Sequence, residues 1–285
     1  MRVLVTGAGG FVGGVVAAYL HNAGVSVVGT VHSRDIDVPF MTVKFELSEP
    51  WPDLGGFDTI IHAAGSLPHK EKNFQIYKRN NIDAMQELLV YAKSHNIPRI
   101  IYLSTIGIYG EFRDETITEE SDRINQDSYG LTKYIAECLL RASGIKNISL
   151  RMPGIIGKGS HGVWLPNTVE KFLKNENVVI YSPDFETRNF VWVEDLARFT
   201  AHLLRMEQWK YNIVNLAAHE KITVRKIVDE IKKLTGSHSN IIIDNSIRRP
   251  FCMDDARAVE MGYVSITPVE MVHKFCSSEE VNFDF

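Results

Sequence analysis

The chain has 285 residues, 45% of them hydrophobic and 23% charged, which is enough apolar material for a full globular core. Its net charge of -4 argues against a nucleic-acid partner, because such proteins carry a concentrated positive surface. The three cysteines lie far apart without a C-x-x-C pair, so we expect no metal site, no disulfides and a reducing cytoplasm. Five glycines interrupt the uncharged run after Arg2, so we expect neither a signal peptide nor a membrane segment.

The first predicted unit is a strand, a tight turn and a helix. Residues 3–5 are apolar and β-branched, and residues 15–20 have the composition of a helix. Between them, Gly7 makes the turn, Gly10 allows backbone to approach a pyrophosphate, and Gly13 lets the helix pack on the strand. Such a turn places phosphates at a helix N-terminus, but steric reasons alone can also produce it.

A second strand is expected over residues 25–31, with His32 and Arg34 at its tip. In dinucleotide-binding folds this tip contacts the adenosine ribose, where a carboxylate suits NAD and a basic residue suits the 2′-phosphate of NADP. No carboxylate occurs before Asp35, so the sequence favours NADP, with NAD still possible. The alternative is that both basic side chains belong to a solvated loop.

Further strands are expected over residues 42–45 and 58–62. The second of these leads into Ala63 and Ala64, whose small side chains let backbone lie close to a flat ligand. His62 has no second metal ligand at a suitable spacing, so we expect a structural histidine.

A long helix over residues 73–94 and a fully apolar strand over 98–104 continue the alternation. Strands that alternate with helices predict an α/β fold with a doubly wound, Rossmann-like parallel sheet. Ligands of such sheets bind beyond the carboxyl ends of the strands, which is where Thr105 lies.

A capped helix over residues 128–140 begins with Tyr129 and Lys133, which are four residues apart and therefore on one face. A nearby ammonium lowers the pKa of a phenol and makes it a usable acid–base group. One such pair can arise by chance on a solvated helix. The glycine turn, Thr105, Tyr129 and Lys133 in this order are far more specific.

With these motifs the chain resembles the extended short-chain dehydrogenase/reductase family, in particular its nucleotide-sugar epimerases, dehydratases and reductases. Residues 150–157 resemble the family's segment after the sixth strand, and residues 188–197 resemble its R-D-F-x-H-V-x-D-x-A stretch. The resemblance covers nearly the whole chain.

The resemblance implies a role for each matching residue. Tyr129 exchanges a proton with the sugar oxygen, Lys133 lowers the tyrosine pKa and holds the nicotinamide ribose, and Thr105 hydrogen-bonds the same oxygen, with Ser104 as the fallback. Arg188 matches the position that grips the substrate's diphosphate, with a surface ion pair as the alternative. Phe11 and Val12 are the remaining candidate contacts of the cofactor. Arg249 is a further candidate contact of the substrate, although the positive cluster that contains it is equally compatible with a solvated loop.

The implied organisation is a dinucleotide-binding domain of residues 1–153 and 189–217, with the latter returning to the sheet. Residues 154–188 and 218–285 then form a smaller α+β lobe that caps the substrate. A homodimer is implied, with the helices at 73–94 and 128–143 as its seam.

Ile106 and Gly107 occupy the positions where dehydratases of this branch carry an Asp-Glu pair, so we do not expect 4,6-dehydration. A 4-keto-sugar reductase and a sugar 4-epimerase remain. The basic strand tip and the short cap favour an NADP-dependent reductase of a nucleotide-linked 4-keto sugar, with an NAD-dependent 4-epimerase as the alternative. Reduction of a non-sugar ketone, or a non-catalytic NADP-binding sensor or scaffold, are the other hypotheses, and Tyr129 with Lys133 argues against the last.

Overall fold

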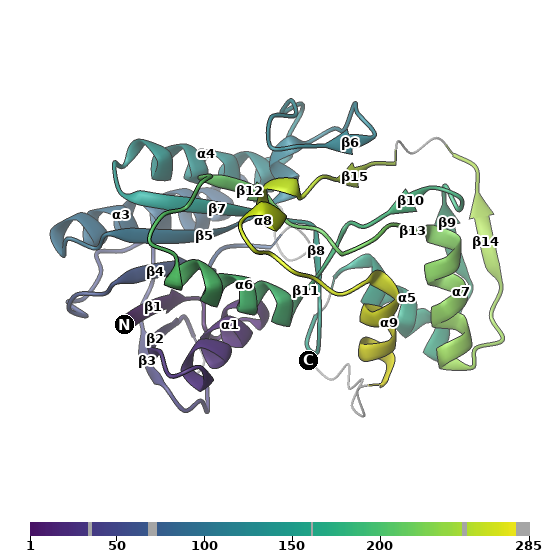
Figure 1. Cartoon of the computed structure of the whole chain (residues 1–285), viewed down its shortest axis with the longest axis horizontal. Coiled ribbons are helices and arrows are strands. Elements are labelled where there is room, and N and C mark those ends of the chain that lie inside the picture. Colours follow the sequence, from purple (N-terminus) through teal and green to yellow (C-terminus); the bar gives the residue numbers. More distant parts are fainter. Residues whose placement is uncertain (34–35, 68–72, 161, 247–249, 278–285) are drawn as a thin grey trace.

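The computed structural model describes residues 1–33, 36–67, 73–160, 162–246 and 250–277. A parallel sheet of seven strands forms its centre, in the spatial order β12-β7-β5-β4-β1-β2-β3 (Figure 1). In chain order the strands are β1 (Arg2–Thr6), β2 (Ser26–Val31), β3 (Met41–Lys44), β4 (Thr59–His62), β5 (Arg99–Thr105), β7 (Lys146–Met152) and β12 (Ile213–Asn215). The predicted doubly wound parallel sheet is therefore confirmed.

Helices cover both faces of this sheet. On one face, α1 (Phe11–Asn22) packs beside α6 (Val193–Arg205), and on the other α3 (Ala84–Ser94) packs beside α4 (Ser128–Ala142) (Figure 1). The side chains of β1 alternate between these layers, since Val3 and Val5 join the core under α1 and α6 whereas Leu4 joins the core under α3 and α4. A strand buried on both faces explains the uninterrupted apolar run in the sequence.

The helix expected over residues 73–94 contains a different helical geometry in its middle. It starts as α2 (Phe74–Tyr77), passes through a π-helical segment, η1 (Lys78–Asp83), and continues as α3. Apolar spacing predicted the helix but not this segment. Asn81 lies within η1 and is buried, and π-helical turns often accompany functional sites.

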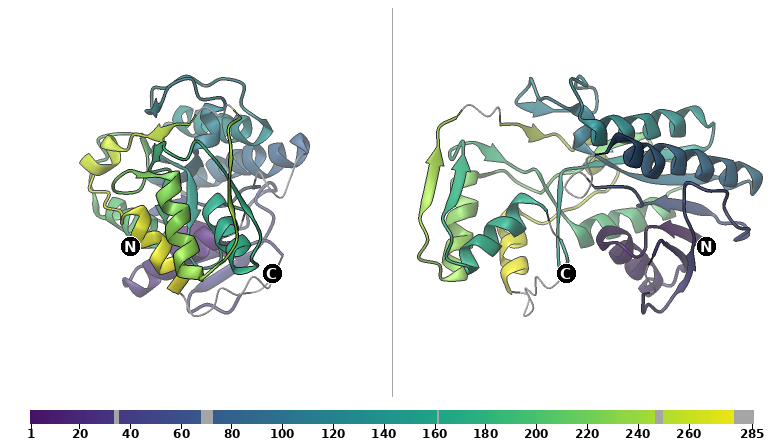
Figure 2. Two further views of the ribbon diagram at one scale, coloured as in Figure 1. Left: turned by 90° about the vertical axis from the view of Figure 1, so that its right-hand side faces the viewer. Right: turned by 180° about the vertical axis from the view of Figure 1, so that it is seen from behind.

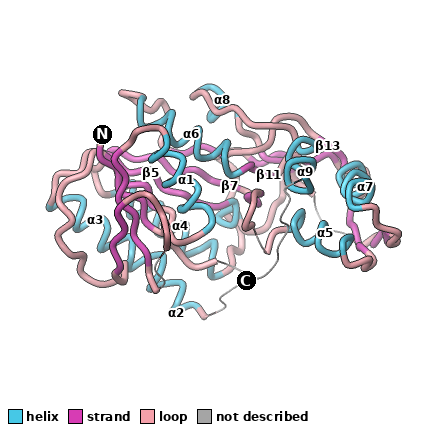
Figure 3. The backbone as a smooth tube through the Cα atoms, turned by 90° about the horizontal axis from the view of Figure 1, so that it is seen from below, coloured by secondary structure: helices cyan, strands magenta, loops and turns pink. Residues whose placement is uncertain are grey.

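A second, smaller lobe lies beyond one end of the sheet (Figures 2 and 3). Its own hydrophobic core is formed mainly by α5 (Trp164–Leu173), α7 (Val224–Thr235) and α9 (Pro268–Ser277). Thr223 caps α7, because its Oγ1 accepts a hydrogen bond from the Lys226 backbone N–H. The smaller elements are the strand pairs β9 (Val178–Tyr181) with β14 (Ile241–Asp244), β8 (Gly154–Ile156) with β11 (Phe190–Trp192), β10 (Glu186–Thr187) with β13 (Ile222–Thr223), and β6 (Thr116–Ile117) with β15 (Cys252–Met253), and the short helices η2 (Ile106–Tyr109) and α8 (Ala256–Glu260).

Residues 189–217 return to the central sheet only in part. Their last strand, β12, pairs in parallel with β7. Their first strand, β11, instead pairs with β8 outside the seven-stranded sheet. Across the described ranges, no helix combines the length and apolar character needed to cross a membrane, and no cluster of three or more metal-ligating side chains occurs.

Candidate active site

The glycine turn joins β1 to α1 by very close backbone contacts. Gly7 has φ +72°, and a Cβ there would lie 2.9 Å from the Ala64 Cα. A Cβ on Gly13 would lie 2.3 Å from the Gly7 carbonyl oxygen, so the helix can approach the turn only without a side chain. Gly10 is the N-cap of α1 and provides no side-chain cap for its first N–H groups. These features fit the diphosphate of a dinucleotide, which such N–H groups bind.

The neighbouring candidate cofactor contacts surround this turn. Phe11 packs against Gly157, because a Cβ added to Gly157 would lie 3.2 Å from the Phe11 ring. Val12 packs against the hydrophobic core, so only its backbone can serve a ligand. The backbone N–H groups of Ala63 and Ala64 donate to Thr6 Oγ1 at 3.2 and 3.3 Å, which ties the end of β4 to the end of β1.

His62 is a buried structural residue beside these alanines. Its Nδ1 lies 2.8 Å from Thr6 Oγ1, and its ring stacks on Tyr102 with the centroids 5.5 Å apart. Because Thr6 Oγ1 accepts from two N–H groups, its own proton is directed to Nδ1. Burial, with a smaller effect of the Lys133 charge, lowers the pKa of His62 to about 3.

Replacing His62 with asparagine should make the protein more resistant to acid. The folded-state pKa of about 3 lies below the ordinary value of 6.5, so the wild type loses stability as the pH falls below 6.5 toward 3. Asparagine does not titrate, and its Oδ1 can accept the Thr6 proton. Urea unfolding should show a loss of stability between pH 7 and 4.5 that is smaller than the wild type's by roughly 2–3 kcal/mol. The exposed His238→Asn serves as control, and equal pH dependence of His62→Asn and wild type would contradict the expectation.

Thr105 and Tyr129 meet at the carboxyl end of β5. Thr105 caps η2, with its Oγ1 accepting from the Gly107 N–H at 3.1 Å. A Cβ on Gly107 would lie 3.5 Å from both Thr105 Oγ1 and Tyr129 Cδ1, so the two side chains are neighbours there. The hydroxyl of Ser104 is buried and donates to Glu137 Oε1 at 2.6 Å. Thr105 rather than Ser104 is therefore the hydroxyl beside the tyrosine.

The start of α4 holds Tyr129 against this strand end. Asp127 caps the helix and accepts from the Gly130 N–H at 2.7 Å. A Cβ on Gly130 would lie 2.1 Å from the Gly107 carbonyl oxygen, so α4 and η2 touch through backbone. Tyr77 on α2 adds a ring 5.9 Å from that of Tyr129.

The expectation that Lys133 lowers the pKa of Tyr129 is wrong for this structure. Burial, helped by Asp127 and Tyr77, raises the pKa of Tyr129 to about 12, and the Thr105 side chain opposes this only in part. Lys133 is itself buried: its Nζ donates to the Leu103 carbonyl at 2.8 Å, and burial lowers its pKa to about 7. Tyr129 is therefore a protonated phenol at neutral pH.

Arg188 lies in the short connection between β10 and β11. Its Nη2 donates to Asp255 Oδ2 at 2.7 Å and its Nε donates to the Ala218 carbonyl at 2.7 Å. Arg249, the other basic residue expected to contact the substrate, lies outside the described residues.

The family model described as "NAD dependent epimerase/dehydratase family" matches residues 3–217, which include the glycine turn, Thr105, Tyr129, Lys133 and Arg188. The chain belongs to the NAD dependent epimerase/dehydratase family. It is therefore an enzyme of this family.

Individual relatives of this epimerase/dehydratase family member cover most of its length. A putative UDP-glucose 4-epimerase from Methanocaldococcus jannaschii is 27% identical over 264 residues, or 85% of each chain. A dTDP-4-dehydro-6-deoxy-D-allose reductase from Streptomyces sp is 26% identical over 277 residues, or 86% of this chain and 84% of that protein. The crystal structure of UDP-glucuronic acid 4-epimerase from Bacillus cereus in complex with NAD has the same fold, with a TM-score of 0.81 and 22% identity over 97% of each chain.

The tip of β2 has a neighbouring carboxylate that the sequence did not lead us to expect. His32 is exposed, and its Nε2 lies 3.2 Å from Glu46 Oε2, which also accepts from Arg79 Nη2 at 3.3 Å. Arg34 lies outside the described residues. A carboxylate thus lies beside the strand tip, although it follows the next strand rather than β2 itself.

Asn81 is a second residue that sequence reasoning missed. Its Oδ1 accepts from the Ser66 N–H at 3.1 Å, and its Nδ2 donates to Thr132 Oγ1 at 2.9 Å. Because Thr132 directly precedes Lys133 on α4, Asn81 links the loop after β4 to this helix. A buried asparagine in an otherwise helical apolar pattern is the signal that could have indicated it.

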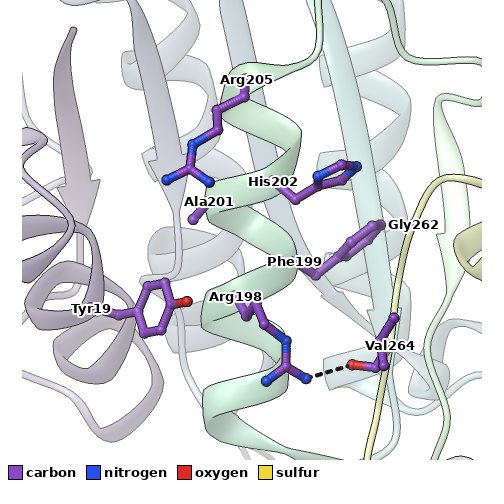
Figure 4. Close-up of a pocket in the computed structure, with 8 residues that line it drawn as sticks. All are labelled: Tyr19, Arg198, Phe199, Ala201, His202, Arg205, Gly262 and Val264. Atoms are coloured by element: carbon purple, nitrogen blue, oxygen red, sulfur yellow. Dashed lines mark hydrogen bonds between the residues drawn. The ribbon is translucent and has the colours of Figure 1, made fainter.

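A cavity of about 210 Å³ lies on the outer side of α6 of this family member (Figure 4). It is lined by Tyr19 from α1, by Arg198, His202 and Arg205 from α6, and by the segment at Val264. Arg198 pairs with Asp195 and donates to the Val264 carbonyl, so it is already engaged. None of its lining residues belongs to the Thr105–Tyr129 site.

Proposed function

We propose that the protein is an NAD-dependent 4-epimerase of a nucleotide-linked sugar. The observation that carries the proposal is the placement of Thr105 and Tyr129 side by side at Gly107, at the carboxyl end of β5, with Lys133 one turn further along α4. Ile106 and Gly107 follow Thr105, so no carboxyl group stands there to remove a second proton or expel water. The pair is therefore equipped to move one proton on one sugar oxygen.

The chain's residues account for the proton in this reaction. In its phenolate form, Tyr129 takes the proton of the C4 hydroxyl while the C4 hydrogen leaves as hydride, and Thr105 hydrogen-bonds the same oxygen. The 4-keto sugar then rotates in the site and presents the opposite face of its C4 carbonyl. Hydride returns to this face of C4 while Tyr129 returns the proton to the oxygen. When bound, the oxidised nicotinamide supplies the reversible hydride acceptor and a positive charge that favours the phenolate.

NAD rather than NADP is the cofactor that we propose. The carboxylate of Glu46 beside the tip of β2 would repel a 2′-phosphate and can accept hydrogen bonds from free ribose hydroxyls. The Bacillus cereus structure contains NAD, which supports the same choice.

Arg188 is the proposed contact of the substrate's diphosphate. Its guanidinium is held by Asp255 and the Ala218 carbonyl, so its orientation is set before substrate arrives. A guanidinium in a fixed orientation keeps its positive charge and can donate hydrogen bonds to the oxygens of both phosphates.

The comparisons support the epimerase over the reductase that the sequence favoured. The size of the capping lobe does not distinguish an epimerase from a reductase, because the alignment with a solved 4-epimerase covers 97% of both chains. The reductase from Streptomyces sp keeps reduction as the competing outcome of the test.

The proposal is tested by incubating purified protein with UDP-glucose and with other UDP- and dTDP-sugars. We expect interconversion of C4 epimers without added nicotinamide and without net change in absorbance at the reduced-cofactor band. Denaturation should release NAD. Steady consumption of NADPH with a nucleotide-linked 4-keto sugar, and no epimerisation, would replace the epimerase with a reductase.

We also propose that two copies pair through α3 and α4. The two helices lie side by side on one face of the sheet (Figure 2). Val90 on α3 is 63% exposed and Leu131 on α4 is 37% exposed, so both present apolar surface. Sedimentation velocity gives the mass of the particle in solution.

A further inference from the structure

A buried ion pair lies directly behind the catalytic residues. Arg151 on β7 and Glu137 on α4 are fully buried, and Arg151 donates from Nη2 to Oε2 at 2.7 Å and from Nε to Oε1 at 3.1 Å. Glu137 Oε1 also accepts from Ser104 Oγ at 2.6 Å. The reaction proposed above assigns these three residues no role.

Such a pair is a poor way to stabilise a core. Removing two charges from water largely offsets their attraction, and apolar residues of similar size often serve as well. Its position is more informative. Tyr129, Lys133 and Glu137 follow one another at four-residue intervals on one face of α4. Ser104 directly precedes Thr105 on β5.

We propose that Glu137 is a positioning residue that holds Thr105 against Tyr129 through Ser104 and whose negative charge stabilises the Lys133 ammonium one turn away on α4. The proposal rests on the function proposed above, because it assigns Glu137 to the same Thr105, Tyr129 and Lys133 site. It has two separable parts, a hydrogen bond to the strand end and a charge beside the lysine.

The hydrogen-bonding part depends on a carboxylate that cannot move. On its far side, Arg151 donates from Nη1 to Tyr109 Oη at 2.9 Å and to the Glu119 carbonyl at 3.1 Å. Tyr109 in turn donates to Asn215 Oδ1 at 2.7 Å. The guanidinium is therefore fixed from both sides, and Glu137 with it.

The charge part depends on the surroundings of Lys133. The ionisable groups around it are His62 on β4, Tyr102 on β5, whose ring centre is 4.2 Å from Nζ, and Tyr129 and Glu137 on α4. Among these, both tyrosines have pKa values raised by burial and His62 has its pKa lowered, so all three are neutral at pH 7. Glu137 is the one that opposes the lowering of the Lys133 pKa by burial.

The hydrogen-bonding part is tested with Ser104→Ala. This variant removes the link from Glu137 to β5 and leaves the ion pair and its charge in place. We expect kcat to fall about tenfold with unchanged KM, because the reacting groups lose alignment but the substrate keeps its contacts. The pH at which the rate declines should remain that of the wild type. Unchanged kcat would overturn this part.

The charge part is tested with Glu137→Gln and read by NMR of lysine labelled at Cε. We expect the midpoint of the Lys133 titration to fall by about one pH unit, so the alkaline decline of the rate moves to lower pH by the same amount. The NMR readout needs no turnover, so it remains decisive even if the protein epimerises no sugar. An unchanged midpoint would overturn the charge part.

Two further variants separate this role from a structural one. Glu137→Asp keeps the negative charge on a shorter side chain that no longer reaches Ser104. The midpoint of the Lys133 titration should therefore equal that of the wild type, while kcat stays low. Should Glu137→Gln fail to fold, Glu137→Asp and Ser104→Ala still test the alignment. Glu170→Gln on α5, which loses an exposed ion pair with Lys174, is the matched control and should match the wild type in both measurements.

Discussion

Replacing Tyr129 with phenylalanine should reduce kcat by about 10²- to 10⁴-fold, the range that a positioned acid–base group contributes. The variant keeps the ring that packs near Tyr77 and loses only the hydroxyl. Bound NAD and KM should change little, because the contacts of the glycine turn and Arg188 remain. Steady-state epimerisation and the NAD content of the purified variant are the measurements.

Tyr134→Phe on the same helix is the matched control, since it removes a phenol from α4 outside the site and keeps the ring below Arg123. It should retain full activity. A Tyr129→Phe variant that performs its biological role as well as the wild type would instead favour a dinucleotide-binding sensor over a catalyst.

Gly13→Ala should abolish most NAD binding and destabilise the fold. The added methyl group would lie 2.3 Å from the Gly7 carbonyl oxygen and 2.8 Å from the Gly7 carbonyl carbon. The helix must then move away from the turn, at a cost of about 1–3 kcal/mol in the free energy of unfolding. A loss of that size in binding free energy raises the Kd for NAD about 5- to 150-fold, which lowers the amount of NAD that the purified protein retains.

Thermal unfolding with and without NAD, together with released NAD per protein, measures both effects. Gly56→Ala is the control for the substitution itself, because a Cβ there meets no atom within 4 Å. If Gly13→Ala bound NAD as tightly as Gly56→Ala, the glycine turn could not be the dinucleotide site.

The order of glycine turn, Thr105, Tyr129 and Lys133 was readable from the sequence because each residue follows a strand or begins a helix. Strand alternation fixed these residues at one edge of the sheet. What could not be read was the effect of burial. An ammonium four residues from a phenol suggested a lowered pKa, whereas the folded chain buries both groups and directs Lys133 to the Leu103 carbonyl.

Contacts between segments that lie far apart in the chain could also not be predicted from the sequence. The tip of β2 was interpreted from His32 and Arg34 alone, but parallel pairing brings β3, and with it Glu46, to the same edge. The partnership of Glu137 with Arg151 likewise joins a helix to a strand across the core. A charged residue inside an apolar strand, and a glutamate one turn after Lys133, were the available hints.

The π-helical segment η1 sets a limit on how this chain can vary in length. Removing one residue between Tyr77 and Ala84 would let the segment close as an ordinary α-helix and abolish the wider turn that carries Asn81. Asn81 would then point away from Ser66 and Thr132. The number of residues in this segment therefore matters to the connection between the loop after β4 and α4.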